Sequence, residues 1–137
     1  MKKNIKNKLW QVKGPLNSKV ENFTVGDDYL CDQKLLPYDV EASLAHAKML
    51  QKINVLTKDE LNKLERGLNE ILALWQKGKF IISQEQEDGH TAIEIYLTKK
   101  FGDVGKKIHT GRSRNDQSLT MMRLYMEAEL TNLQKKL

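Results

Sequence analysis

The strongest constraint on the fold is a run of apolar residues at helical spacing near the end of the sequence. They follow one another at steps of 3, 4, 4, 3 and 4, as Leu119, Met122, Met126, Leu130, Leu133 and Leu137. This spacing places all six on one stripe of a helix, the heptad pattern used in helix bundles. Soluble monomers seldom expose such a stripe. We therefore expect either a piece of a longer protein, which we favour, or a stripe covered by another subunit.

Two earlier helices are predicted to pair as an antiparallel hairpin. Residues 57–60 form a capping box, which opens a helix that stops at Gly78. The apolar face of this helix comprises Leu61, Leu64, Leu68, Ile71, Leu72 and Trp75. Pro37 is expected to start the preceding helix, because proline is favoured in a first turn. A short extended segment is expected after the hairpin, at residues 80–82.

Shorter helices are predicted on either side of this hairpin. Ser18 and Glu21 have capping-box spacing for a helix running to about Val25. Another helix is expected to begin after Asp88, which would cap it, and to end before Gly102.

These patterns predict an all-α fold. Residues 1–109 would form an N-terminal helical domain of helix–turn–helix hairpins, and residues 110–137 a loop and the start of a long, truncated bundle helix. A net charge of +5 favours anionic ligands, but does not separate a small polycarboxylate from nucleic acid. A single cysteine, Cys31, leaves no internal disulfide, and no apolar run fits a signal peptide or a membrane span. We expect a cytoplasmic protein without a membrane partner, and no Cys/His spacing suggests a metal.

Residues 109–117 (His-Thr-Gly-Arg-Ser-Arg-Asn-Asp-Gln) concentrate charged and polar groups just ahead of the last helix. Arg112 and Arg114 face the same side if the segment is extended, and Gly111 favours a loop. Ser113, Asn115 and Asp116 all suit a helix N-cap. Guanidinium groups beside free helical N–H groups would form an anion site. A solvated loop, or a patch that contacts nucleic-acid phosphates, is the alternative.

A second polar group precedes the helix expected after Asp88. Residues 87–92 read Glu-Asp-Gly-His-Thr-Ala. Considered alone, this segment is an acidic helix start that complements the helix dipole, with His90 incidental.

Residues 109–117 resemble the signature of the argininosuccinate lyases, members of the aspartase/fumarase superfamily. Residues 87–92 are similar to the family segment that lines the active site ahead of a helix. Residues 8–10, 39–46 and 102–108 also look like family segments, so the resemblance spans nearly the whole chain and the N-terminal part of a family chain. Residues 11–14 depart from the family pattern, and residues 23–28 lack the family's substrate-contacting serine, so that contact is assigned to no residue.

The resemblance implies an enzyme of arginine biosynthesis that splits argininosuccinate into arginine and fumarate by reversible β-elimination, without a cofactor. It also implies a homotetramer whose active sites combine segments of different subunits. The substrate-binding residues implied are Asn115, the strongest candidate for direct contact, with Arg114, Ser113, Asp88, His90 and Thr91. The general acid and base are expected beyond Leu137. No catalytic residue is therefore assigned in this chain, and the chain alone is expected to be inactive.

Other interpretations remain open at this point. Adenylosuccinate lyase shares the fold, although residues 111–116 favour argininosuccinate. A catalytically inactive relative, of the kind that serves as a structural lens protein, is compatible with these residues. A basic helical module could also contact nucleic-acid phosphates through Lys106, Lys107, Arg112 and Arg114. We expect no nucleic-acid partner.

Overall fold

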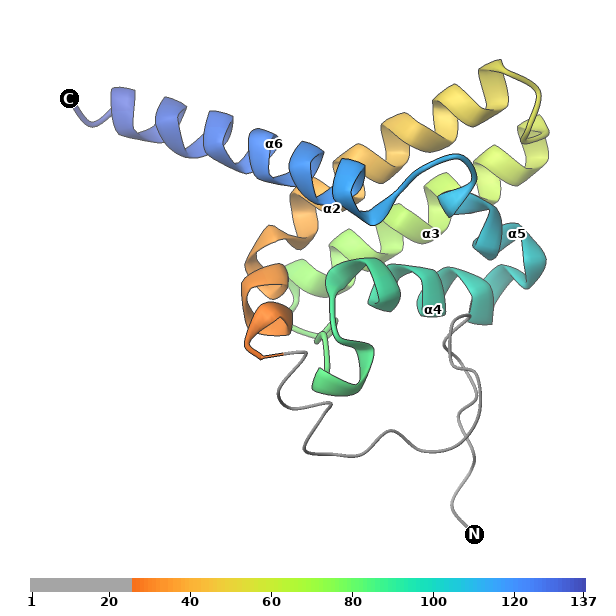
Figure 1. Cartoon of the computed structure of the whole chain (residues 1–137), viewed down its shortest axis with the longest axis horizontal. Coiled ribbons are helices and arrows are strands. Elements are labelled where there is room, and N and C mark those ends of the chain that lie inside the picture. Colours follow the sequence, from red (N-terminus) through yellow and green to blue (C-terminus); the bar gives the residue numbers. More distant parts are fainter. Residues whose placement is uncertain (1–25) are drawn as a thin grey trace, which may run out of the picture.

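The computed structural model describes residues 26–137, and every regular element in this range is helical (Figure 1). The prediction of an all-α fold is confirmed. The main helices are α2 (Asp28–Lys52), α3 (Lys58–Gln76), α4 (Gly89–Phe101), α5 (Asp103–Lys106) and α6 (Arg114–Gln134), with short 3-10 helices η1 (Gln84–Gln86) and η2 (Lys107–His109). The helix predicted between Ser18 and Val25, and the segment at residues 8–10, lie outside the described residues. None of the described helices is both long and apolar enough to cross a membrane.

The hairpin of α2 and α3 and the crossing helix α4 enclose the core (Figure 1). The capping box of α3 is formed as predicted: Thr57 Oγ1 accepts from the Glu60 N–H at 3.2 Å, and Glu60 Oε2 accepts from the Thr57 N–H at 2.9 Å. The largest core side chains are exposed by 2% or less and include Leu36, Leu50, Leu64, Leu68, Ile71, Ile93 and Leu97. Their burial supplies the main driving force that holds the three helices together.

Pro37 does not start a helix, so that prediction is wrong. Helix α2 begins at Asp28 and continues through Pro37. Proline cannot donate the hydrogen bond that residue 37 would make to the carbonyl of residue 33. The Gln33 carbonyl accepts instead from Trp75 Nε1 at 2.7 Å. A contact from α3 therefore satisfies the group that Pro37 leaves unpaired.

Gln33 also fixes the segment at residues 80–82, which is neither helix nor strand. Its side-chain amide donates to the Phe80 carbonyl at 3.0 Å and accepts from the Ile82 N–H at 2.8 Å. The segment is thus paired with a side chain rather than with another strand. This pairing lets Phe80 and Ile82 enter the core on the way to α4.

Helix α6 packs on α2 through its first turns only, and its C-terminal half extends past the other helices (Figure 1). Gln117 and Met121 are buried, and the rings of Tyr38 and Tyr125 meet edge to face at 5.6 Å. The predicted apolar stripe lies on another side of the helix. Its residues are exposed by 40–100%: Leu119, Met122, Met126, Leu130, Leu133 and Leu137.

The close crossing of α4 and α5 requires a glycine at position 105. A Cβ added there would lie 2.4 Å from the backbone carbonyl carbon of Leu97 and 2.4 Å from the Thr98 nitrogen. Backbone atoms cannot rotate away, so we expect Gly105→Ala to lower the free energy of unfolding by about 1–3 kcal/mol, the usual cost of overpacking. Urea denaturation of the parent and the variant measures the loss as a lower midpoint with an unchanged m-value.

Gly67→Ala is the matched control for this prediction. A Cβ at position 67 would lie 2.5 Å from Leu97 Cδ2 and 2.7 Å from Phe101 Cε2, which are side-chain atoms that can move. The Gly67→Ala loss should therefore be the smaller of the two. An equal or greater loss at position 67 would contradict the assignment of the close crossing to Gly105.

Candidate functional site

The start of α4 is held by two carboxylates. The backbone of Glu87 has a φ of +69°, which turns the chain into Asp88. The Asp88 side chain caps the helix, as predicted, by accepting from the Thr91 N–H at 2.7 Å. Asp32, on α2, accepts from the Gly89 N–H at 2.8 Å. Two of the first N–H groups of α4, those of Gly89 and Thr91, are thus already paired within the protein.

The start of α6 is fixed by a capping box. Ser113 Oγ accepts from the Asp116 N–H at 3.2 Å, and an Asp116 carboxylate oxygen accepts from the Ser113 N–H at 3.3 Å. Gly111 precedes it with a φ of +67°, where a Cβ would be strained. Ser113 therefore has a structural role at this helix start, whatever contact with a ligand it makes.

Arg114 joins the starts of α4 and α6. Its Nη1 lies 3.0 Å from Asp88 Oδ2, and its Nη2 donates to Thr91 Oγ1 at 3.1 Å. Both ends of the guanidinium fork are therefore occupied by the neighbouring helix. Arg112 goes elsewhere, with Nη2 donating to Ser43 Oγ on α2 at 3.2 Å. The two arginines do not converge on one partner among the described residues.

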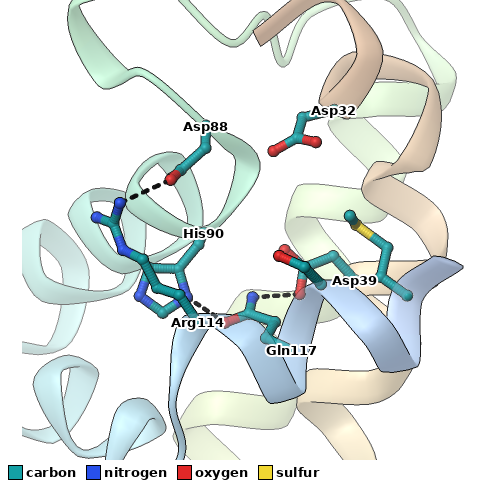
Figure 2. A pocket seen from close by; sticks show the side chains of 8 residues that line it. Asp32, Asp39, Asp88, His90, Arg114 and Gln117 are labelled. Carbon is teal, nitrogen blue, oxygen red and sulfur yellow. Dashed lines mark hydrogen bonds and ion pairs between the residues drawn. The ribbon is translucent and has the colours of Figure 1, made fainter. Parts of the chain in front are cut away.

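A small polar pocket opens between α2, α4 and α6 (Figure 2). It is lined by Asp32, Asp39, Asp88, His90, Arg114, Gln117, Ser118 and Met121. The Gln117 side chain is hydrogen bonded to both His90 and Asp39 across the pocket. Burial raises the pKa of Asp39 to about 6, against the lowering effect of its hydrogen bond from Gln117 and of the nearby Arg112 charge. Three helices thus contribute polar side chains to one site.

His90 and His109 stack beside this pocket, with ring centroids 3.6 Å apart and an interplanar angle of 29°. His109 Nε2 lies 3.4 Å from a carboxylate oxygen of Glu94. Burial, with His90 and the two arginines nearby, lowers the pKa of His109 to about 2. Burial also lowers the pKa of His90. Both rings are therefore neutral at pH 7.

The His90, Glu94 and His109 side chains are potential metal ligands, with ligand atoms within 4.8 Å of one another. Stacked rings direct their in-plane lone pairs side by side, whereas a tetrahedral ion needs ligands that converge on one point. The positive charges of Arg112 and Arg114 also act on this group. The arrangement is therefore a neutral histidine pair rather than a formed metal site.

The lowered histidine pKa values predict a pH-dependent stability. His46, His90 and His109 all have pKa values below 6.5 in the folded chain. Unfolding lets them take up protons, so the free energy of unfolding should fall as the pH drops below 6.5, by at most ~1.4 kcal/mol per pH unit for each histidine. Asp39 acts in the opposite direction below pH 6, because it takes up its proton in the folded chain.

Urea denaturation between pH 7.5 and pH 5.5 measures this dependence as a slope. The variant His109→Gln removes the most strongly shifted group, so its slope should be shallower whatever its absolute stability. Equal slopes in the two proteins would contradict the assignment to His109.

The structure brings four of the six predicted site residues together: Asp88, His90, Thr91 and Arg114. Ser113 lies next to them in the cap of α6. Asn115 is exposed at the second residue of α6 and does not line the pocket. Sequence reasoning missed Asp32, Asp39 and Gln117. The available signal was that Asp39 lies between Leu36 and Ser43 on the core-facing stripe of a helix, where a charged residue requires a partner.

Comparison with known proteins places the chain in a class. A sequence model of a lyase family, described as "Lyase", matches residues 12–137, which include both helix starts and the pocket. The chain therefore belongs to this family of all-α lyases.

Within that family the chain is similar to argininosuccinate lyases. It is 52% identical to the argininosuccinate lyase of Thermotoga neapolitana over 126 residues, which are 92% of this chain and 32% of that protein. It is 44% identical over 128 residues to the enzyme of Xylella fastidiosa, covering 93% of this chain and 29% of that protein. It is 45% identical to the argininosuccinate lyase of Parabacteroides distasonis over 126 residues, which are 92% of this chain and 28% of that protein. The chain spans roughly a third of the length of these relatives.

Proposed function

We propose that the full-length protein to which this chain belongs is an argininosuccinate lyase of arginine biosynthesis. The observation that supports this most directly is the meeting of the two family-like segments, residues 87–92 and 109–117, around one polar pocket (Figure 2). The relatives that match more than nine-tenths of the chain carry the name argininosuccinate lyase. In this function the chain supplies substrate-binding groups rather than the acid and base.

The reaction divides into tasks that can be assigned to groups. A base removes a proton from the carbon next to the one that bears the nitrogen. The electron pair of that C–H bond forms the C=C bond, and the C–N bond breaks. An acid then protonates the departing guanidino nitrogen. Negative charge builds up on the carboxylate and must be held by hydrogen-bond donors. We assign no acid or base to the present residues and place both in segments beyond Leu137 or in other subunits.

The exposed start of α6 suits the carboxylate-binding task. The first N–H groups of a helix lack intrahelical partners. At the start of α6, the Ser113 side chain accepts a hydrogen bond from one of them, the Asp116 N–H. Asn115 is exposed beside them and is our first candidate for substrate contact. Arg114 adds positive charge while holding Asp88 and Thr91 in place. His90 lines the pocket and completes the set. No cofactor is required by this scheme.

The proposed protein is a cytoplasmic homotetramer whose active sites are shared between subunits. The exposed apolar stripe on α6 supports this assembly, because burial in a helix bundle would remove it from water. The nucleic-acid alternative receives less support. Lys106 pairs with Asp103, Lys107 pairs with Glu60 and Arg114 pairs with Asp88, which neutralises much of the basic segment.

An assay for fumarate separates these possibilities. The full-length protein should convert argininosuccinate to equal amounts of fumarate and arginine, followed by ultraviolet absorbance and amino-acid analysis. The 137-residue chain alone should give no turnover above the blank. Failure of the folded full-length protein to form fumarate from either argininosuccinate or adenylosuccinate would favour a non-enzymatic relative. Turnover of adenylosuccinate instead would favour the sister enzyme.

A further inference from the structure

A largely buried chain of hydrogen bonds connects α2, α4 and α6 along the wall of the pocket. Arg112 Nη2 donates to Ser43 Oγ at 3.2 Å, and Ser43 Oγ lies 3.3 Å from Asp39 Oδ1. The Gln117 side chain joins the same Asp39 oxygen to His90 Nδ1 (Figure 2). Asp39, Ser43 and Gln117 are exposed by 3% or less. We call these five side chains the Asp39 network.

The direction of every hydrogen bond in the Asp39 network is determined by its charged members. Arginine can only donate, so Ser43 Oγ must accept from Arg112 and is free to direct its own hydrogen at Asp39. An ionised Asp39 can only accept, so the amide nitrogen of Gln117 must face it. The amide oxygen of Gln117 then faces His90. Because that oxygen can only accept, His90 Nδ1 must carry the hydrogen.

We propose that Asp39, acting through Gln117, fixes the tautomer of His90 so that Nδ1 is protonated and Nε2 carries the lone pair. His90 is then held as a neutral ring with one acceptor available beyond the network. A histidine in solution interconverts between tautomers, and its acceptor nitrogen is set in proteins by the hydrogen bond that the other nitrogen makes. Gln117 and Asp39 are therefore positioning residues for His90.

The fixed tautomer matters for the kind of ligand that His90 can receive. A lone pair at Nε2 accepts a hydrogen bond from an N–H donor, such as a guanidino or ammonium group, and does not donate to a carboxylate. This consequence rests on the proposed function, in which the substrate carries both kinds of group. It assigns His90 to the nitrogen-bearing part of the substrate and leaves the carboxylate to the start of α6.

The tautomer can be measured directly in the 137-residue chain. Long-range ¹H–¹⁵N correlation spectra are recorded with ¹⁵N-labelled histidine at about pH 8, where an Asp39 carboxyl with a pKa of about 6 is ionised. The signals of His90 are those that disappear in His90→Gln. We expect a protonated, pyrrole-type Nδ1 and an unprotonated, pyridine-type Nε2. A protonated Nε2, or averaged signals for the two nitrogens, would overturn the proposal.

Two variants test whether Asp39 is the cause. Asp39→Asn keeps the shape of the side chain but offers both a donor and an acceptor, so Gln117 can turn end for end. The His90 signals should then move toward the other tautomer or toward their average. Ser43→Ala removes only the branch to Arg112, and the His90 signals should stay as in the parent chain. An unchanged Nδ1–H tautomer in Asp39→Asn would show that Asp39 does not set it.

The tautomer of His90 and the proposed function are tested independently. If the full-length protein fails to act on argininosuccinate, the function fails but the measured tautomer is unaffected. If the full-length protein is active, Asp39→Asn should raise KM more than it lowers kcat, because His90 binds substrate here and transfers no proton. An equal KM in parent and variant, although the tautomer has changed, would remove His90 from substrate binding. Should Asp39→Asn not fold, the spectrum of the parent chain alone still decides the tautomer.

Discussion

Arg114→Lys in the full-length protein is expected to lower kcat/KM for argininosuccinate by about 10- to 100-fold. The arginine makes two contacts at once, to Asp88 at 3.0 Å and to Thr91 at 3.1 Å, and a lysine ammonium cannot span both in the same plane. A lost hydrogen bond to a charged group costs about 1.5–3 kcal/mol, which corresponds to the stated loss of rate if the contacts hold the site in its active geometry. Steady-state kinetics with argininosuccinate measure the change.

Arg66→Lys supplies the matched control. Arg66 is exposed on α3, where its guanidinium lies over the ring of Phe101, away from the pocket residues. The same chemical change at that position should leave kcat/KM within about twofold, because the side chain is exposed and lies away from the pocket. Similar losses at both positions would show that the effect is not specific to the helix starts.

A double-mutant cycle shows whether Arg114 acts through Asp88. If Arg114 mainly holds Asp88 and Thr91, the loss in Arg114→Lys combined with Asp88→Asn should be smaller than the sum of the single losses. If Arg114 instead contacts substrate independently of Asp88, the losses should add. Unchanged kinetics in Arg114→Lys would contradict both roles and leave Arg114 with none in the reaction.

Local sequence patterns predicted the starts of α3, α4 and α6, because the capping interactions there join neighbouring residues. The capping box joins Thr57 and Glu60, which are three positions apart, and the cap from Asp88 to Thr91 has the same spacing. The start of α6 was narrowed to a few candidates, and Ser113 is the one whose side chain caps the helix. Each of these can be recognised in a sequence window of four residues.

The interactions that organise the pocket are invisible to such a window. Gln33 and Trp75 are 42 residues apart, and their hydrogen bond makes Pro37 acceptable inside a helix. Gln117 and Asp39 are 78 residues apart. The sequence around either residue does not indicate that the other is its partner. A buried aspartate requires a partner, but the residues around Asp39 do not say which one. Only the packing of α6 on α2 identifies that partner as Gln117.

The apolar stripe of α6 shows a different limit. Periodicity predicted the helix and the stripe correctly, but a stripe carries no information about what covers it. In the described part of the chain the buried side of α6 is instead the one with Gln117 and Met121. The stripe remains exposed, at 54% for Met126 and 63% for Leu130. The proposed homotetramer assigns this surface to helices of other subunits.

Met126→Glu combined with Leu130→Glu should therefore prevent assembly of the full-length protein. Burying each apolar side chain contributes about 1.5–3 kcal/mol, so losing two costs at least about 3 kcal/mol per subunit before the introduced charges are counted. Light scattering after size exclusion should show dimers or monomers at concentrations where the parent is a tetramer. Activity should be lost with the assembly, because the proposed active site combines segments of different subunits.

Thr131→Glu is the control for this prediction, since it adds a negative charge in the same turn of α6. Successive residues are 100° apart around a helix, so Thr131 lies well away from the stripe that contains Met126 and Leu130. This variant should remain assembled and active. If the double variant stays tetrameric and the parent does too, the stripe is not the subunit interface. If the double variant dissociates but keeps full activity, the active site is complete within one subunit, and the shared site must be abandoned while the interface is retained.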